Sequence, residues 1–333
     1  MITETRKRVF SGIQPSGDLH IGNYIGALRN WVRMQDERDC HLGIVDLHAI
    51  SVWQDPAELH KASRQVAMLL MACGIDPGKV KLFIQSHISE HAELCWLLNC
   101  VTPVSWLQRM TQYKSKSEAQ KETASTGLLD YPVLQAADIL IYQSHYVPVG
   151  EDQKQHVELT RAIARRFNNL YGETFIIPQV ELPPVGARIM GLDDPTVKMS
   201  KSIGGQRKGH ALRLLDPPDV LRKKMRKAVT DPGTEIKFDP SRPGVTNLLT
   251  IYQICTEQEK TAIEAHFEGK GYAALKGEVA DAVIEFLRPV RERYAQLEAE
   301  PGYVEGILRQ GVEKARPLAI QTLQTAKDQM GVG

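Results

Sequence analysis

The chain has 333 residues, with 41 Lys and Arg against 40 Asp and Glu, and a formal net charge of +1. This length suits two domains and lets roughly three-quarters of the unfolded surface be buried, so the fold requires neither disulfides nor a structural metal. No apolar run reaches the roughly 18 residues of a membrane span, and residues 1–8 lack the apolar core of a signal peptide. These features exclude a membrane partner and predict a cytoplasmic protein. The five cysteines form no C-x-x-C pair and are expected to be buried free thiols.

The first half of the chain alternates short apolar strands with helices. Strands are expected at 8–11, 40–45 and 81–84. Helices are expected to begin near Gly22 and to span 56–73, 92–98 and 131–142. This alternation predicts an α/β fold with a Rossmann-type parallel sheet, which binds ligands at the carboxyl ends of its strands. The polar residues that follow such ends are Asp18, His20, His48 and Gln85.

Beyond about residue 203 the strand pattern fades and apolar residues recur at helical spacing. Helices are expected at 218–230, 245–255, 257–267, 272–298 and 301–330. The chain is therefore predicted to contain a Rossmann domain at 1–190 with a helical insertion, a mobile loop at 191–206, and a C-terminal all-helical domain at 207–333.

A first motif, His20-Ile21-Gly22-Asn23, follows a Gly/Pro loop at the start of a helix. The N-terminus of a helix presents backbone N–H groups to a phosphate, and Gly22 permits close backbone approach. His20 and Asn23 can donate to phosphate or ribose oxygens. The alternative interpretation is that His20 only caps the helix.

A second motif, Lys198-Met199-Ser200-Lys201-Ser202, places two ammonium groups and two hydroxyls on one loop. Cations that engage the charge of a pentavalent phosphorus and a leaving pyrophosphate stabilise the transition state selectively. Flanking glycines at 191, 204 and 205 would let this loop close. An ordinary basic surface loop is the alternative. Together the two motifs predict a site that holds ATP while its α-phosphate is attacked.

Residues 198–242 are strongly basic, with twelve Lys and Arg against five Asp and Glu. The densest part is Arg222-Lys223-Lys224-Met225-Arg226-Lys227. Such a run is either a solvated helix face or a contact for a polyanion, since phosphate contacts dominate nucleic-acid affinity.

The two motifs resemble the signatures of class I aminoacyl-tRNA synthetases, and longer segments resemble the bacterial tryptophanyl-tRNA synthetase family. These segments are Phe10-Ser-Gly-Ile-Gln-Pro-Ser-Gly17, Ile44-Val-Asp-Leu-His-Ala-Ile50, Tyr131-Pro-Val-Leu-Gln-Ala-Ala-Asp-Ile139 and Val149-Gly-Glu-Asp-Gln-Lys-Gln-His156. Further segments up to Tyr272 continue the resemblance, so it covers nearly the whole chain. Long matched segments in a fixed order are more specific than either short motif.

The resemblance implies that tryptophan is activated with MgATP to tryptophanyl-adenylate and then transferred to the 3′ end of tRNA(Trp). No metal held by the protein is expected beyond the Mg²⁺ that accompanies ATP, because Cys255 alone cannot form the iron–sulfur cluster of some relatives. The resemblance also implies a homodimer formed through the catalytic domains, with apolar candidates at Trp96, Leu97 and Trp106. The helical domain, with residues 222–227, is the expected place for anticodon contacts.

The resemblance also assigns roles to residues. The expected tryptophan-binding residues are Phe10, His48, Tyr131, Gln135, Asp138, Val149 and Gln153. The expected ATP-binding residues are Gln14, His20, Gly22, Asn23, Gly150, Asp152, Lys198, Met199, Ser200 and Lys201. The expected catalytic residues are His20, Lys114, Lys198 and Lys201. Asp138 should accept the indole N–H, since a carboxylate on an apolar helix face is costly unless a donor satisfies it. The alternative from the residues alone is a helix Asp bonded to another side chain. Phenylalanine brings no such donor and would be rejected.

Three alternatives remain open from the residues. Gln135 stands where many bacterial members carry methionine, and Leu-Gln-Ala-x-Asp at 134–138 also resembles the tyrosyl enzyme, so a tyrosine-specific synthetase is one alternative. A non-catalytic tryptophan-binding paralogue is another, although both motifs are intact. A nucleotidyltransferase acting without tRNA would share the first motif but would not need the helical domain.

Overall fold

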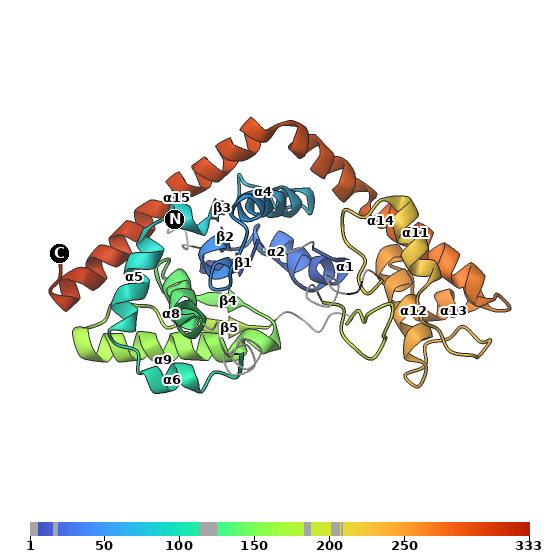
Figure 1. Cartoon of the computed structure of the whole chain (residues 1–333), viewed down its shortest axis with the longest axis horizontal. Helices are drawn as coiled ribbons and strands as arrows, with labels where there is room; N and C mark the ends of the chain where they lie inside the picture. Colours follow the sequence, from blue (N-terminus) through green and yellow to red (C-terminus); the bar gives the residue numbers. More distant parts are fainter. Residues whose placement is uncertain (1–5, 16–18, 113–124, 183–187, 201–206, 208) are drawn as a thin grey trace, which may run out of the picture. The chain divides into compact units, whose positions relative to one another are not determined.

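The computed structural model describes residues 6–15, 19–112, 125–182, 188–200, 207 and 209–333. They form two compact units, which are coloured along the chain in Figure 1. Unit 1 comprises Met1–Ser16, Trp31–Pro184 and Glu300–Gly333, and unit 2 comprises Gly17–Asn30 and Val185–Ala299. This division differs from the boundaries predicted at 190 and 207. A short early segment and the last helix each pack with a unit that is distant in sequence.

Unit 1 is built on a five-stranded parallel sheet with the order β3-β2-β1-β4-β5. The strands are β1 (Arg8–Ile13), β2 (Asp39–Ile44), β3 (Lys81–Ile84), β4 (Tyr146–Pro148) and β5 (Gln179–Glu181). The parallel α/β prediction is confirmed. The strands β4 and β5 escaped prediction because three residues are too few to show a pattern. The chain turns from one side of β1 to the other, and such a switch point is where open parallel sheets bind ligands.

Helices surround this sheet in unit 1. They are α3 (Asp46–Ala49), α4 (Pro56–Ala72), α5 (Glu90–Asn99), α6 (Val104–Gln108), α8 (Thr126–Leu140), α9 (Lys154–Tyr171) and α15 (Pro301–Met330), with short 3₁₀ turns η2 (Gln85–His87) and η3 (Glu151–Gln153). The start of α4 is fixed by the Asp55 carboxylate, which accepts from two backbone N–H groups at 3.0 Å. In the part of the chain that the structure describes, no helix is long and apolar enough to cross a membrane.

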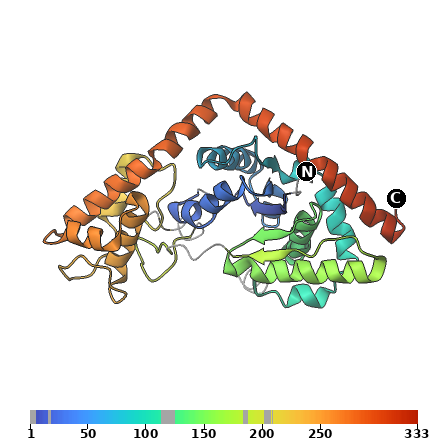
Figure 2. The same ribbon diagram turned by 180° about the vertical axis from the view of Figure 1, so that it is seen from behind.

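The last helix, α15, belongs to unit 1 because it packs on the sheet. It lies against β3 and α5, and both views show it running past them (Figures 1 and 2). Gly311 makes this approach possible, since a Cβ atom there would overlap the backbone carbonyl of Leu82 in β3. Small residues continue the contact, and Ala315 and Ala319 are fully buried in the core of the unit.

Unit 2 is mainly helical, as predicted. It contains α1 (Ile21–Asn23), a π-helical turn η1 (Tyr24–Leu28), α11 (Pro218–Arg226), α12 (Pro243–Thr256), α13 (Lys260–Phe267) and α14 (Tyr272–Ala299). Helix α2 (Arg29–Met34) begins in unit 2 and belongs to unit 1 from Trp31 onward. The long helix α14 packs against α11 and α12. The helix predicted at 257–267 begins only at Lys260, because Glu257 adopts a left-handed φ of 57° that ends α12.

The cysteines carry free thiols, as expected, but not all of them are buried. Cys40, Cys73 and Cys95 are buried, Cys255 is half-buried and Cys100 is exposed. The prediction of a buried thiol was wrong for Cys100 because this residue lies at the end of α5 and its side chain faces solvent.

The packing of α15 on β3 can be tested at Gly311. We expect Gly311→Ala to lower the free energy of unfolding by about 1–3 kcal/mol, because the added methyl group forces the helix away from β3. Gly306 lies in the same helix with open space around its Cβ position, so Gly306→Ala should stabilise the fold by up to about 1 kcal/mol. Urea unfolding of both variants measures the difference, and equal effects would contradict the close contact.

Candidate functional site

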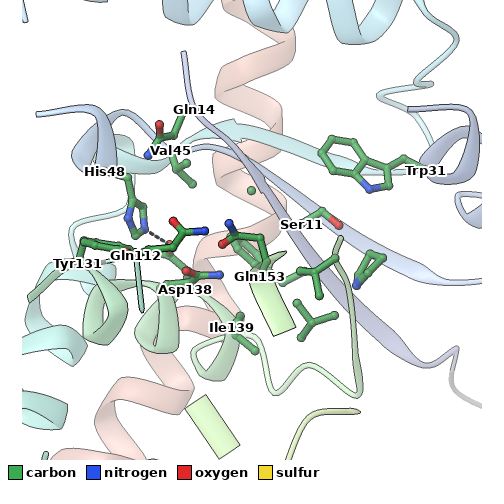
Figure 3. A pocket seen from close by; sticks show the side chains of 16 residues that line it. Ser11, Gln14, Trp31, Val45, His48, Gln112, Tyr131, Asp138, Ile139 and Gln153 are labelled. Atoms are coloured by element: carbon green, nitrogen blue, oxygen red, sulfur yellow. Dashed lines mark hydrogen bonds and ion pairs between the residues drawn. The ribbon is translucent and has the colours of Figure 1, made fainter. Parts of the chain in front are cut away.

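A cavity of about 330 Å³ opens in unit 1 at the carboxyl ends of the central strands (Figure 3). Its volume is within the range of roughly 300–1,000 Å³ that is typical of small-molecule sites. The walls come from β1, from the segments after β2 and β4, and from α8. The cavity therefore lies at the switch point of the sheet, where β1 separates the two halves.

The cavity brings together all seven residues predicted to bind the amino acid, and also Gln14. They are Phe10, His48, Tyr131, Gln135, Asp138, Val149 and Gln153. The lining residues that sequence reasoning missed are Ser11, Gly12, Trp31, Val45, Gln112, Ile139, Val147 and Pro148. Most of these are chain neighbours of predicted residues, which was a usable signal. Trp31 and Gln112 come from other segments: Trp31 was expected only on the apolar face of the first helix, and Gln112 lies in a segment, 110–116, that resembles a family loop.

Asp138 is the charged centre of this cavity, on α8 with only 1% of its surface exposed. Its Oδ1 atom accepts from Gln85 Nε2 at 2.6 Å and lies 2.7 Å from His91 Nδ1. Its Oδ2 atom lies 2.8 Å from His48 Nε2. Burial raises the pKa of Asp138, but the hydrogen bonds from His48 and His91 outweigh burial and hold that pKa below its ordinary value. Asp138 is therefore an ionised acceptor at neutral pH.

The other polar groups of the cavity surround Asp138. The Tyr131 hydroxyl lies 2.9 Å from His156 Nε2, and burial raises the pKa of Tyr131 to about 12, so the phenol is neutral. Gln153 Nε2 donates to Asp152 Oδ2 at 2.9 Å, where η3 begins after Gly150. Within the described residues, no group of three or more His, Cys, Asp or Glu side chains is placed to hold a metal ion.

The first sequence motif lies in unit 2, where the backbone fixes it firmly. Ile21 donates its N–H to Leu212 at 2.9 Å, and Leu214 donates to Leu19 at 2.9 Å. Asn23 Oδ1 accepts the backbone N–H of His20 at 3.1 Å, which closes the first turn of α1. His20 itself is buried, with 3% of its surface exposed.

The second motif also lies in unit 2, at the end of a backbone-paired segment. Met199 donates to Ile189 at 3.1 Å and is itself buried, whereas Lys198 is exposed. His210 supports this segment: its Nδ1 lies 2.6 Å from Asp193 Oδ1 and its Nε2 lies 3.4 Å from the Lys198 carbonyl. Ser200 follows and is half-buried. The predicted residues Lys114 and Lys201 lie outside the described residues.

The segment 210–214 therefore contacts both motifs, through His210 at Lys198 and through Leu212 at Ile21, and Leu214 bonds Leu19 directly before the first motif. Sequence reasoning did not identify this segment. It did identify Gly191 as a possible hinge, and the structure adds a packing reason for glycine there, since a Cβ atom would overlap the His210 ring.

The basic residues 222–227 fall on α11 and just after it, but they do not all face solvent. Lys224 Nζ bonds Asp216 Oδ2 at 2.6 Å and the Ala211 carbonyl at 2.8 Å, and Met225 is fully buried. The exposed cations are Arg222, Lys223, Arg226 and Lys227. Arg222 forms an ion pair with Asp281 at 2.8 Å. The exposed part of the basic stretch is therefore smaller than the sequence indicated.

Comparison with known proteins gives consistent results. The family described as tRNA synthetases class I (W and Y) matches residues 3–288. A tryptophan–tRNA ligase of Wolinella succinogenes is 54% identical over 327 residues, which are 98% of this chain and 99% of that protein. The tryptophanyl-tRNA synthetase of Campylobacter jejuni, solved with ADP and tryptophan, has a TM-score of 0.87 at 34% identity and covers 98% of this chain and 100% of its own. The Mycoplasma pneumoniae synthetase has a TM-score of 0.85 at 36% identity, covering 99% of both chains.

The ionised state of Asp138 predicts a pH dependence of stability. The folded pKa lies below the ordinary value of 3.8, so the carboxylate stabilises the fold above that pH and the contribution is lost as the pH falls through the folded pKa. We expect the free energy of unfolding to fall more steeply for the wild type than for Asp138→Asn as the pH falls below the ordinary value of 3.8. Urea titrations across this range measure both slopes, and parallel slopes would count against the ionised network.

Proposed function

The chain belongs to the class I tRNA synthetases of the W and Y group, and we propose that it is a tryptophan–tRNA ligase. It activates tryptophan with MgATP to tryptophanyl-adenylate and pyrophosphate, and then transfers tryptophan to the 3′ end of tRNA(Trp). The observation that carries the proposal is the buried Asp138 acceptor in a cavity lined by Phe10 and Val149. Full-length relatives at about half identity, named for this activity, support it.

Asp138 accepts the indole N–H of tryptophan in this proposal. The buried carboxylate is a hydrogen-bond acceptor only, so an amino acid that brings a donor satisfies it and phenylalanine does not. Phe10, Val149 and the His48 ring then pack around the indole. Tyr131 and Gln153 hold the ammonium group and orient the carboxylate of the substrate, and Gln135 lies beside Asp138 on α8.

The chemistry of activation needs no general base. The carboxylate of tryptophan is ionised at neutral pH, attacks the α-phosphorus of ATP, and the bond from that phosphorus to pyrophosphate breaks. Catalysis then consists of positioning and stabilisation of the developing charge. Lys198 and Lys201, with Lys114, supply cations for the phosphates, and Mg²⁺ enters with ATP as part of the substrate.

The remaining ATP contacts come from the first motif and from residues beside the cavity. We assign the ribose and phosphates to His20, Gly22 and Asn23, with Met199 and Ser200 of the second motif. We also assign ATP contacts to Gln14, which lines the cavity, and to Gly150 and Asp152, which lie between the lining residues Val149 and Gln153 in the sequence. The Campylobacter jejuni relative, solved with ADP and tryptophan, supports a nucleotide and an amino acid as the two ligands.

The partners in this proposal are tRNA(Trp) and a second copy of the chain, in the cytoplasm. Phosphates of the tRNA would meet the exposed cations Lys223, Arg226 and Lys227. Anticodon contacts would then come from the helices between 207 and 299, since α15 belongs to unit 1. Among the apolar residues expected at a dimer interface, Trp96 is 68% exposed and supports the proposal, whereas Leu97 is buried.

Exchange of labelled pyrophosphate into ATP tests the proposed function. We expect exchange that depends on tryptophan and not on tyrosine or phenylalanine. Asp138→Asn should lower kcat/KM for tryptophan roughly tenfold to hundredfold, the effect of losing a hydrogen bond to a charged group. Asp130→Asn is the matched control on the same helix, where Asp130 bonds Asn99 instead, and should keep nearly full exchange.

Two outcomes would contradict the proposal. Exchange driven by tyrosine would favour the tyrosine-specific alternative, and no exchange with any of the three amino acids would favour the non-catalytic one.

A further inference from the structure

A second buried layer of polar groups lies behind Asp138, away from the cavity. His91 of α5 is fully buried and does not line the cavity. Its Nδ1 atom lies 2.7 Å from Asp138 Oδ1, and its Nε2 atom lies 2.7 Å from the hydroxyl of Tyr142, which is also fully buried. Hydrogen bonds thus connect Tyr142 through His91 to Asp138 in the wall of the cavity.

The chemistry of Asp138 and Tyr142 determines which atoms of this network donate hydrogen bonds. An ionised carboxylate only accepts, so His91 Nδ1 must carry a hydrogen and donate it to Asp138. Burial, together with the charges of Asp138 and Glu90, raises the pKa of Tyr142 well above its ordinary value, so the phenol keeps its hydrogen. The hydroxyl contacts His91 Nε2 at 2.7 Å, which fixes the orientation of the ring with Nδ1–H facing Asp138.

The direction of the Gln85 hydrogen bond is fixed in a similar way. The Gln85 Oε1 atom accepts the backbone N–H of Leu47 at 3.2 Å, so the amide nitrogen must face Asp138. Asp138 Oδ1 therefore receives two donors, and Oδ2 receives one, from His48. A carboxylate offers about four acceptor positions, so the described residues leave one position, and it lies on Oδ2.

We propose that His91 is a positioning residue for amino-acid selection, which holds Asp138 so that a single acceptor position on Oδ2 is left for the indole N–H. This inference rests on the proposed function, because it takes tryptophan as the ligand of the cavity. His91 acts only through Asp138, since it does not reach the cavity itself. A ligand with one N–H donor fills the remaining acceptor position of the Asp138 carboxylate, and an isostere without that donor leaves this position without a hydrogen bond.

The test compares two ligands that differ only at the indole nitrogen. Isothermal titration calorimetry measures the dissociation constants of tryptophan and of 3-(3-benzothienyl)alanine, in which sulfur replaces the N–H. We expect wild-type protein to prefer tryptophan, and His91→Leu to reduce the ratio of the two constants roughly tenfold by weakening tryptophan alone. Binding of ATP should not change. His91→Asn, whose amide can place a donor near the former Nδ1, should recover most of the ratio.

Two further variants separate positioning from packing. Tyr142→Phe removes only the hydroxyl and should reduce the ratio in the same direction by a smaller factor. His41→Leu is the matched control: the His41 ring is as buried as His91 and stacks on Tyr142 at 4.4 Å, yet within the described residues no hydrogen bond joins it to Asp138. This control should leave the ratio unchanged.

The outcomes distinguish the inference from the function on which it rests. Equal weakening of both ligands in His91→Leu, an unchanged ratio there, or a reduced ratio in His41→Leu would each overturn the positioning role alone. No preference for tryptophan in the wild-type protein would overturn the proposed indole contact, and the inference with it.

Discussion

An ionised carboxylate buried in the wall of an apolar cavity must be surrounded by donors, and much of unit 1 is arranged around that requirement. Asp138 comes from α8, Gln85 from the end of β3, His91 from α5 and His48 from α3. A charge taken out of water without partners would cost several kcal/mol. These elements must therefore pack so that the three donors lie within hydrogen-bond distance of Asp138. The same donors that keep the carboxylate ionised leave it one acceptor position, which joins stability to amino-acid selection.

The two sequence motifs depend on a different constraint, within unit 2. Both motifs are also held by residues outside them. The backbone of Leu212 bonds Ile21 of the first motif, and His210 contacts the Lys198 carbonyl of the second. Residues separated by nearly 180 positions are thereby attached to one short segment, which gives the nucleotide contacts of the proposal a common support.

The sequence predicts the parts of this structure that rest on local pattern or on long matched segments. The strands β1 to β3 fall on the stretches expected at 8–11, 40–45 and 81–84, α14 and α15 show helical spacing over many turns, and every predicted amino-acid contact lies at the cavity. Tertiary contacts leave no such signal. No local sequence pattern shows that α15 packs on β3 at Gly311. Nor does any such pattern show that His91 of α5 bonds Asp138 of α8. The sequence predicts that Asp138 accepts either a ligand donor or another side chain, and the structure shows three protein side chains within hydrogen-bond distance of it.

The indole N–H of bound tryptophan reports on Asp138 most directly. With tryptophan labelled with ¹⁵N in the ring, proton NMR of the complex gives the chemical shift of that single hydrogen. A hydrogen bond to an ionised carboxylate is short and strong, so the resonance should lie well downfield of free tryptophan and should move back in Asp138→Asn. The same shift in the two complexes would show that the indole does not meet this carboxylate, and would contradict the account of the site.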